Sequence, residues 1–214
     1  MRPETLNPIE IIDLGVLRYG EALSRQEAAH AEISADCRPG IIFTVEHEPV
    51  LTMGKNSEQG NLLFAREFYE NQGVEIFDTE RGGQVTAHML GQLVVYPILN
   101  MTTLGLTVRS YVNILEESVI QTLAKYDIKA HRDPEHPGVW VGHEKICAMG
   151  VRIKSRVSMH GLALNVNNDL SLFGKIIPCG IKFRGVTSIE RHLGLSPAME
   201  MVRADLLREI TSRI

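Results

Sequence analysis

The chain has 214 residues, of which 44% are hydrophobic and 22% charged, and its formal net charge is -4. These values are typical of an ordinary globular protein, and they predict a single domain over residues 1–214 with enough apolar side chains for a core. The small acidic excess disfavours general binding to nucleic acid or to an anionic membrane, because such surfaces require a basic excess.

The cysteines and the N-terminus indicate the cellular compartment. Cys37, Cys147 and Cys179 contain no C-x-x-C pair and are too few for a disulfide framework. Residues 1–5 lack the pattern of a signal peptide, and no apolar run reaches the 18 residues of a membrane span. We therefore expect a soluble, cytoplasmic protein with free thiols.

The first half of the chain predicts helices and strands in alternation. A helix is expected from near Leu14 to the breaker at 38–40, because apolar and small side chains recur at three- and four-residue steps. The helical stripe comprises Tyr19, Leu23, Gln26, Ala29 and Ile33. Strands are expected at 41–45 and 74–77, with 50–53 extending the same sheet after a turn at Pro49 and a short helix at 62–71.

The second half of the chain predicts a long helix between strands. Residues 81–88 read as a glycine turn that leads into extended chain, and 91–99 as an apolar strand. A helix follows over 108–123, then a polar connection at 128–138. Strands at 139–141, 145–153 and 157–166 are separated by gaps short enough for antiparallel hairpins. Residues 169–180 are expected to be irregular, with a tight turn at 178–180, before a closing helix at 199–214.

This order of elements is mixed and does not repeat a strand–helix–strand unit. It predicts an α+β fold with a mixed, largely antiparallel sheet flanked by helices.

Two residues are candidates for nucleophilic chemistry. Cys179 lies between Pro178 and Gly180, where a large substrate could reach the sulfur, although most free cysteines are simply small buried hydrophobes. Only a few per cent of an ordinary thiol is ionised at pH 7, so a nucleophilic cysteine needs a nearby cation or base. Lys145 opens an apolar strand and is either that cation or a strand-edge residue that reaches out to water.

Other motifs are weaker. The turn at 81–83 offers backbone N–H groups and a guanidinium to an anion or a carbonyl group, but it lacks the Lys-Ser/Thr of a phosphate loop and is often a plain turn. The histidines are scattered, and His131 and His136 have no metal-site spacing, so no metal is expected. Cys147 is expected in the core.

Taken together and in order, these segments resemble the lipoyl(octanoyl) transferases, which are similar in fold to biotin- and lipoate-protein ligases. The resemblance spans about residues 14–195. It rests on the segments 45–54 (VEHEPVLTMG), 81–86 with His88, 91–94, 137–141, 145–150, 160–166 (HGLALNV), 178–181 (PCGI) and 186–188.

The resemblance implies transfer of an octanoyl group to a lysine of a lipoyl domain. The donor would be octanoyl-acyl carrier protein, and the acceptors would be lipoyl domains of 2-oxoacid dehydrogenases and the glycine cleavage H protein, without a cofactor. Cys179 matches the nucleophile that carries the acyl group as a thioester, and Lys145 matches its partner. The segments matching substrate-binding stretches are Arg81, Gly82, Gly83, Gln84, Val85, Thr86, Ala87 and His88; Ala148, Met149 and Gly150; and Gly161, Leu162 and Ala163.

The residue types are consistent with this chemistry. An ammonium beside a thiol stabilises the thiolate and can pass a proton to a departing thiol. Small residues leave room for a thin acyl chain, and the N–H of Cys179 or Gly180 could face an oxyanion. Basic residues that could meet acidic carrier proteins are Arg152, Lys154, Arg156, Lys182 and Arg184.

The sequence departs from the family around residue 87. Ala87 stands where the family usually has an aromatic residue, and Met89-Leu90 replaces Gly-Pro. This departure predicts a reshaped wall of the acyl pocket.

Three other functions stay open. The chain could be an ATP-dependent lipoate or biotin ligase, which needs no cysteine. It could be an amidotransferase between lipoyl-type domains, with its thiol elsewhere in the chain. It could also be a non-catalytic binder of acyl chains or carrier proteins.

Overall fold

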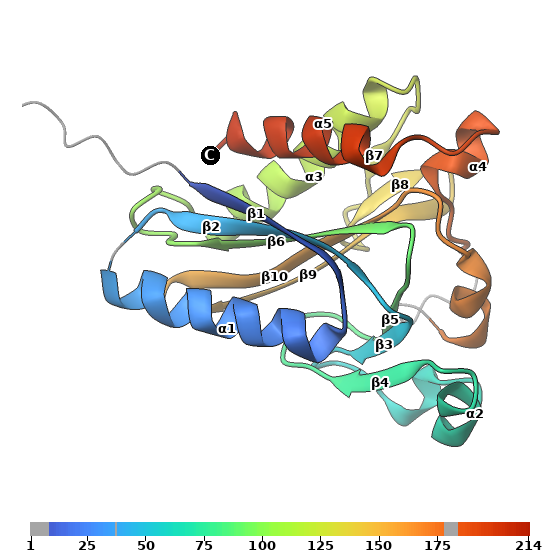
Figure 1. Ribbon diagram of the computed structural model, residues 1–214. Helices are drawn as coiled ribbons and strands as arrows, with labels where there is room; N and C mark the ends of the chain where they lie inside the picture. The colour runs from blue at the N-terminus through green and yellow to red at the C-terminus, as the bar shows by residue number, and fades with distance from the viewer. Residues whose placement is uncertain (1–8, 37, 178–183) are drawn as a thin grey trace, which may run out of the picture.

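The structure is a computed structural model that describes residues 9–36, 38–177 and 184–214. Its described part contains two sheets (Figure 1). The larger has seven strands in the order β1-β2-β6-β10-β9-β8-β7, and the smaller has three in the order β4-β3-β5. The strands are β1 (Glu10–Leu17), β2 (Gly40–His47), β3 (Val50–Met53), β4 (Glu75–Asp78), β5 (Thr86–His88), β6 (Gln92–Leu99), β7 (His131–Arg132), β8 (Val139–Val141), β9 (Glu144–Lys154) and β10 (Val157–Asn165).

Within the large sheet only β1 and β2 are parallel, and every other neighbouring pair is antiparallel. In the small sheet β3 runs parallel to β4 and antiparallel to β5. The prediction of an α+β fold with a mixed, largely antiparallel sheet is confirmed.

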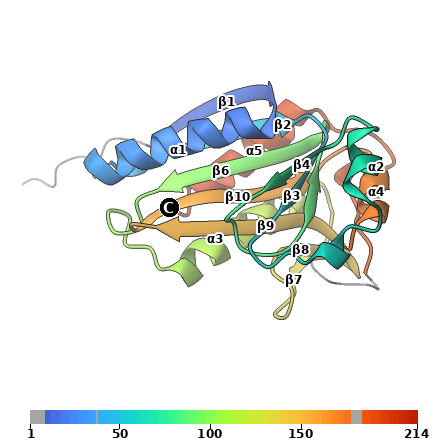
Figure 2. The same cartoon turned by 90° about the horizontal axis from the view of Figure 1, so that it is seen from below.

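Helices cover both faces of the large sheet. α3 and α5 lie on one face, and α1 lies on the other beside the small sheet (Figures 1 and 2). The helices are α1 (Tyr19–Asp36), α2 (Arg66–Glu70), α3 (Val108–Ala124), α4 (Ile189–Leu193) and α5 (Met199–Thr211), with 3-10 turns η1 (Gln59–Asn61) and η2 (Leu170–Lys175).

The helices are held by apolar stripes and caps. On α5, Val202, Leu206 and Ile210 recur every four residues and are fully buried, which contributes about 2 kcal/mol for each side chain. The α3 helix begins with a capping box between Thr107 and Ser110. α3 and α5 pack against each other over the large sheet and close its main core.

The prediction of a helix starting near Leu14 was wrong. Residues 10–17 form β1, an edge strand whose side chains are mostly exposed, so they carry little strand-like alternation. The helix begins at Tyr19, and Ala22 occupies the stripe position expected for Leu23. Tyr19, Gln26, Ala29 and Ile33 are buried as predicted.

The residues after Pro49 were assigned to the wrong sheet. β3 pairs with β4 and β5 and forms the centre of the small sheet, because the chain turns out of the large sheet after His47. The helix expected at 62–71 is confined to Arg66–Glu70, and Leu62 instead bridges to Ile176.

Several short elements were not predicted. β7 lies inside the connection expected at 128–138, η2 inside the irregular stretch expected at 169–180, and α4 follows residue 188. The turn predicted at 178–180 lies outside the described residues.

Candidate active site

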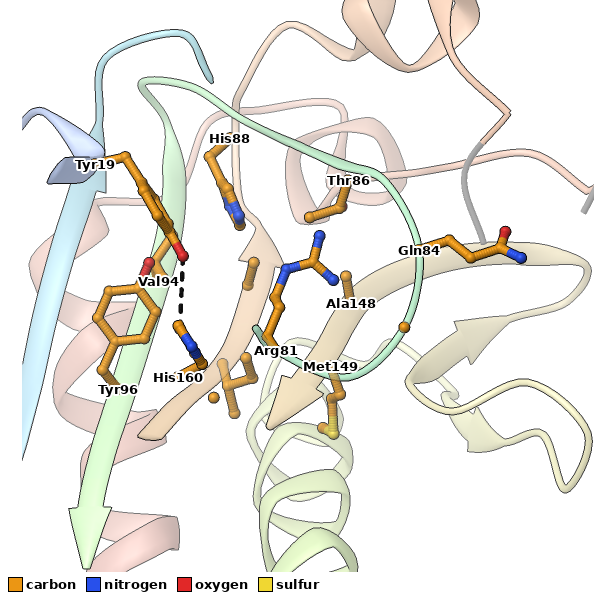
Figure 3. A pocket seen from close by; sticks show the side chains of 15 residues that line it. Tyr19, Arg81, Gln84, Thr86, His88, Val94, Tyr96, Ala148, Met149 and His160 are labelled. Atoms are coloured by element: carbon orange, nitrogen blue, oxygen red, sulfur yellow. Dashed lines mark hydrogen bonds between the residues drawn. The ribbon is translucent and has the colours of Figure 1, made fainter. Parts of the chain in front are cut away.

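A cavity lies between the large sheet and the turn at 81–84, and we call it the central cavity. Its floor is provided by β6, β9 and β10, where Ala163 pairs with Val94 on one side and with Ala148 on the other. Three short side chains next to one another leave open space above the sheet. The lining residues are Tyr19, Arg81, Gly83, Gln84, Thr86, His88, Val94, Tyr96, Ala148, Met149, Gly150, His160, Gly161, Leu162 and Ala163 (Figure 3).

The turn at 81–84 is fixed on both sides. Gly82 N–H donates to the carbonyl of Val151 in β9 over 3.1 Å, and the carbonyls of Arg81 and Gly83 accept from the N–H groups of Lys55 and Asn56. Gly83 has a φ of 87°, a conformation that glycine adopts without strain. The rim of the cavity is therefore held between β9 and the loop after β3.

Arg81 is buried and its guanidinium is directed at Thr52 of β3. Nη2 donates to the Thr52 carbonyl over 2.6 Å and to its Oγ1 over 2.8 Å, and Nε donates to the same Oγ1 over 3.2 Å. The sequence suggested that this guanidinium meets an anion or a carbonyl group, and it donates to the carbonyl of Thr52 and, from Nη1 over 3.1 Å, to that of Gly82.

Polar aromatic side chains gather at one end of the cavity, where His47 lies behind the lining residue Tyr96. His47 accepts from Tyr96 Oη at Nε2 over 2.8 Å and donates from Nδ1 to the Leu17 carbonyl. Tyr19 Oη lies 3.5 Å from Nδ1 of His160, and the Tyr19 ring stacks on His88 with centroids 6.1 Å apart (Figure 3). Four elements, α1, β2, β5 and β6, therefore converge on β10 at this end.

Burial keeps these groups neutral. Burial lowers the pKa of His47 to about 4, and burial together with the positive charge of Arg81 lowers the pKa of His160 to about 4. The pKa of His88 is also lowered well below its usual value, first by burial and then by neighbouring charge. Burial raises the pKa of Tyr19 to about 12. The lining is thus uncharged near pH 7 apart from Arg81.

A hydrogen-bond chain leads from the cavity into the body of the protein. His88 donates from Nδ1 to Gln92, whose Nε2 donates to Asn165 over 2.8 Å. Asn165 donates in turn to the carbonyl of Thr187 over 2.9 Å, and the N–H of Thr187 donates to the carbonyl of Lys145. This chain fixes the ring of His88 and ties residues 185–187 to the start of β9.

Lys145 lies in a second cavity, which we call the Lys145 cavity. This cavity shares Gly83, Gln84, Met149 and Gly150 with the central cavity. The Lys145 side chain is buried, and its Nζ donates to the carbonyl of Pro137 over 3.0 Å and lies 4.8 Å from the centre of the Trp140 ring. The ammonium is therefore held inside the Lys145 cavity, which adjoins the central cavity, and does not extend into solvent.

The structure brings together most of the residues expected at the site. Gly82 lines the Lys145 cavity together with Lys145. The residues singled out in the sequence that line the central cavity are Arg81, Gly83, Gln84, Thr86, His88, Ala148, Met149, Gly150, Gly161, Leu162 and Ala163. Cys179 and Gly180 lie outside the described residues, as do Lys182 and Cys37.

Val85 and Ala87 do not line the cavity. β5 alternates, so Thr86 and His88 face the cavity while Val85 and Ala87 point into the cluster beneath the small sheet. Met89 packs in that same cluster, and Leu90 is half exposed. None of the side chains of Ala87, Met89 and Leu90 lines the central cavity, and the reshaping of an acyl-pocket wall stays a prediction.

The basic residues expected to meet a carrier protein are partly neutralised. Arg152 pairs with Glu80, and Arg184 pairs with Asp133 while lying 5.0 Å from the Trp140 ring centre. Cys147 is buried in the main core as predicted, and burial raises the pKa of its thiol.

Sequence reasoning missed four lining residues, Tyr19, Val94, Tyr96 and His160. Val94 and His160 lie within segments that carried the family resemblance, which was the available signal for them. Within the described ranges, no group of three or more His, Cys, Asp or Glu side chains could hold a metal ion, and no helix is long and apolar enough to span a membrane.

Solved structures of low sequence identity share this fold. One is the lipoate-protein ligase A bound with ATP, which is 15% identical with a TM-score of 0.78 and covers 97% of this chain and 85% of that one. Another is the putative lipoate protein ligase Ta0514 from T. acidophilum, 16% identical with a TM-score of 0.77 and the same coverage. The biotin protein ligase from Aquifex aeolicus aligns more loosely, at a TM-score of 0.54, with 14% identity over 97% of this chain and 69% of that one.

Curated relatives are much closer in sequence. The octanoyltransferase of Bacteroides fragilis is 40% identical over 212 residues, which is 94% of this chain and 96% of that protein. The octanoyltransferase of Caldicellulosiruptor saccharolyticus is 42% identical over 188 residues, covering 87% and 80% of the two chains. The family model of the lipoyl protein ligase A/B catalytic domain matches residues 18–211. The chain therefore belongs to the lipoyl protein ligase A/B catalytic domain family and, within it, to the octanoyltransferases.

Proposed function

We propose that this chain, as one catalytic domain over residues 1–214, moves an octanoyl group from octanoyl-acyl carrier protein to a lysine of a lipoyl domain in the cytoplasm. The acceptors are lipoyl domains of 2-oxoacid dehydrogenases and the glycine cleavage H protein. Cys179 carries the acyl group between donor and acceptor as a thioester. The observation that carries this proposal is the buried Lys145 ammonium in a cavity that adjoins the one floored by Ala148 and Ala163.

In the first step the Cys179 thiolate attacks the carbonyl carbon of the donor thioester. The new C–S bond forms as the bond to the carrier sulfur breaks, and the carrier thiolate takes a proton from the Lys145 ammonium. One thioester replaces another, so the step needs no external energy source. The products are the acyl-enzyme, the free carrier thiol and a neutral Lys145 amine.

In the second step the lysine amine of the lipoyl domain attacks the acyl-enzyme. The amide bond forms, Cys179 leaves as the thiolate, and Lys145 takes up the proton that the attacking amine loses. This step restores the starting charges of both side chains. Lys145 is suited to both proton transfers because its Nζ is held in place by Pro137.

The central cavity supports an alkyl chain as the transferred group. Its floor combines alanines, glycines and Val94, which offer apolar surface without bulk. His88 and His160, the histidines that line it, have lowered pKa values and are neutral near pH 7, so the chain meets no charged imidazolium.

The reaction is tested with purified protein, octanoyl-acyl carrier protein and a lipoyl domain in the absence of ATP. We expect the lipoyl domain to gain one octanoyl group by intact-protein mass, and Cys179→Ala to abolish this gain. Modification that requires free octanoate and ATP would instead indicate a ligase. Transfer that survives Cys179→Ala would place the thiol elsewhere, and binding without transfer would indicate a non-catalytic binder.

A further inference from the structure

The central cavity has a direction along the large sheet. Lys145 is the second residue of β9, Ala148 and Gly150 follow on the same strand, and Val151 is paired with His160. Ala148 is the first residue of β9 that lines the central cavity, and the three steps from it to Val151 correspond to about 10 Å of extended strand. The central cavity therefore extends along β9 from Ala148 to the ring of His160 (Figure 3).

His160 reaches this end through an unusual backbone conformation. Its φ is 57°, which lies in the left-handed region that residues other than glycine rarely adopt. Strict alternation along β10 would place His160 on the face of Leu162 and Leu164, which belong to the core under α3. The observed conformation turns the ring toward Tyr19 of α1, on the face that lines the cavity.

The position of His160 is fixed by α1. The buried Gln26 accepts the His160 backbone N–H at Oε1 over 2.9 Å, and Tyr19 Oη faces the imidazole at 3.5 Å. Both partners belong to the buried stripe of the helix. The ring is thus held across the end of the cavity by the body of the protein.

A surface cleft begins on the other side of His160, and we call it the lateral cleft. It is lined by Leu23, Glu27, Asp78, Thr79, Glu80, Arg152, Lys154, Met159 and His160. Among the described residues that line the lateral cleft, only His160 also lines the central cavity. Its imidazole therefore separates the cavity from the cleft.

We propose that His160 is the end wall of the acyl site and determines the longest acyl chain that the enzyme transfers. The inference rests on the proposed function and assigns a specificity role within it. An acyl chain whose carbonyl lies beside Ala148 extends along β9 toward His160, and added methylenes would meet the ring. Without the imidazole, the end of a longer chain would pass into the lateral cleft.

The test compares acyl carrier protein loaded with chains of 8, 10, 12 and 14 carbons as donors, with kcat/KM for transfer to a lipoyl domain as the readout. For the unmodified protein we expect kcat/KM to fall at least about tenfold from 8 to 12 carbons. His160→Gly removes the ring, and glycine adopts the positive φ without strain. In this variant kcat/KM for the 12-carbon donor should lie within about threefold of that for the 8-carbon donor. His160→Asn tolerates the same backbone and keeps a smaller side chain, so 10 carbons should be accepted and 14 rejected.

The control is Ser155→Gly, since Ser155 is exposed in the β9–β10 turn and also has a positive φ, of 50°. It relieves the same kind of strain and should leave the chain-length ratio unchanged. A folded His160→Gly variant that transfers octanoyl groups with the unmodified ratio would overturn the inference. If that variant does not fold, an unchanged ratio in His160→Asn has the same consequence. Failure of the unmodified protein to transfer any chain would instead overturn the proposed function, and the inference with it.

Discussion

Arg81 holds Thr52 through three hydrogen bonds, two to its hydroxyl and one to its carbonyl. The same hydroxyl lies 3.3 Å from Nε2 of His88, to which it donates. One buried guanidinium therefore joins the 81–84 turn, the small sheet and the histidine of the cavity wall. Arg81 acts as an anchor of the cavity as well as part of its lining.

Arg81→Lys should weaken the protein although it keeps the charge. An ammonium cannot reproduce the fork of the guanidinium, so at least one buried bond to Thr52 is lost and the free energy of unfolding should fall by about 2 kcal/mol. Urea denaturation measures this, and KM for the acyl donor should rise. Arg66→Lys is the matched control, because Arg66 is exposed and pairs with Asp78 at 3.5 Å. Equal stabilities of the two variants would contradict the anchoring role.

The three buried histidines predict sensitivity to acid. Their pKa values are lower in the folded protein, about 4 for His47 and His160, than the usual 6.5 of the unfolded chain. Between pH 6.5 and 4 the unfolded chain binds more protons, so stability that is complete above pH 6.5 is lost as the pH falls toward 4. His47 and His160 each account for about 3 kcal/mol of this loss.

The acid sensitivity is measured by urea denaturation across this pH range. His160→Asn should reduce the slope of stability against pH, while His143→Gln, at an exposed position, controls for the replacement of a histidine. Identical slopes for His160→Asn and the unmodified protein would show that His160 is not buried in its neutral form.

Glu116 is linked to Lys145 through residues 137–138, so the proposed function predicts that it positions the lysine. Its Oε1 accepts from the N–H of Gly138 over 3.2 Å, and the neighbouring carbonyl of Pro137 accepts from Lys145 Nζ. Glu116→Ala should release this loop and lower kcat roughly 10- to 100-fold with little change in KM. Glu116→Gln, which keeps an acceptor oxygen for Gly138, should recover most of the lost rate.

The control for Glu116 is its neighbour Glu117. Both carboxylates bind Arg132, but within the part of the chain that the structure describes Glu116 is the one of the two that accepts from the N–H of Gly138. Steady-state kinetics should therefore show a much smaller loss for Glu117→Ala. Equal losses in the two alanine variants would assign the effect to Arg132 and not to the loop.

Gly161 is required by the sheet itself. A Cβ at this position would lie 2.2 Å from the Val95 carbonyl oxygen and 2.8 Å from Cδ of Pro97, so β6 and β10 would have to separate. Gly161→Ala should lower the free energy of unfolding by about 3 kcal/mol. Gly174→Ala, where nothing lies within 4 Å of the added carbon, should change it by less than about 0.5 kcal/mol. Thermal and urea unfolding of both variants distinguish steric conflict from a general effect of replacing glycine.

The sequence predicted those elements whose pattern lies within their own residues, and it did not predict features that depend on distant segments. β6 and β10 are fully buried apolar runs, and the α3 stripe repeats over several turns, so each was recognised within its own segment. β1 was not predicted as a strand because its side chains are mostly exposed, so its sequence lacks the alternating apolar residues that indicate a half-buried strand. The pairing of β3 with β4 and β5 depends on segments about 25 to 35 residues away, which periodicity does not record.

The site residues divide in the same way, into those that belong to a local motif and those that tertiary packing brings to the cavity. The small residues of β9 and β10 and the 81–88 segment were found because each belongs to a motif. Tyr19 and Tyr96 looked like ordinary core positions of a helix and a strand, and only the packing of α1 against the sheet brings them to the cavity. The alternation of β5 could have excluded Val85 and Ala87 from the lining once Thr86 and His88 were placed there.

The most direct test of the account is the intact mass of the protein after mixing with octanoyl-acyl carrier protein alone, without ATP and without a lipoyl domain. We predict a gain of one octanoyl group that hydroxylamine removes and that Cys179→Ala does not acquire. Lys145→Met, which keeps a long side chain without the ammonium, should form this adduct far more slowly. An unmodified mass under these conditions, or an adduct that forms equally in Cys179→Ala, would contradict the thioester mechanism.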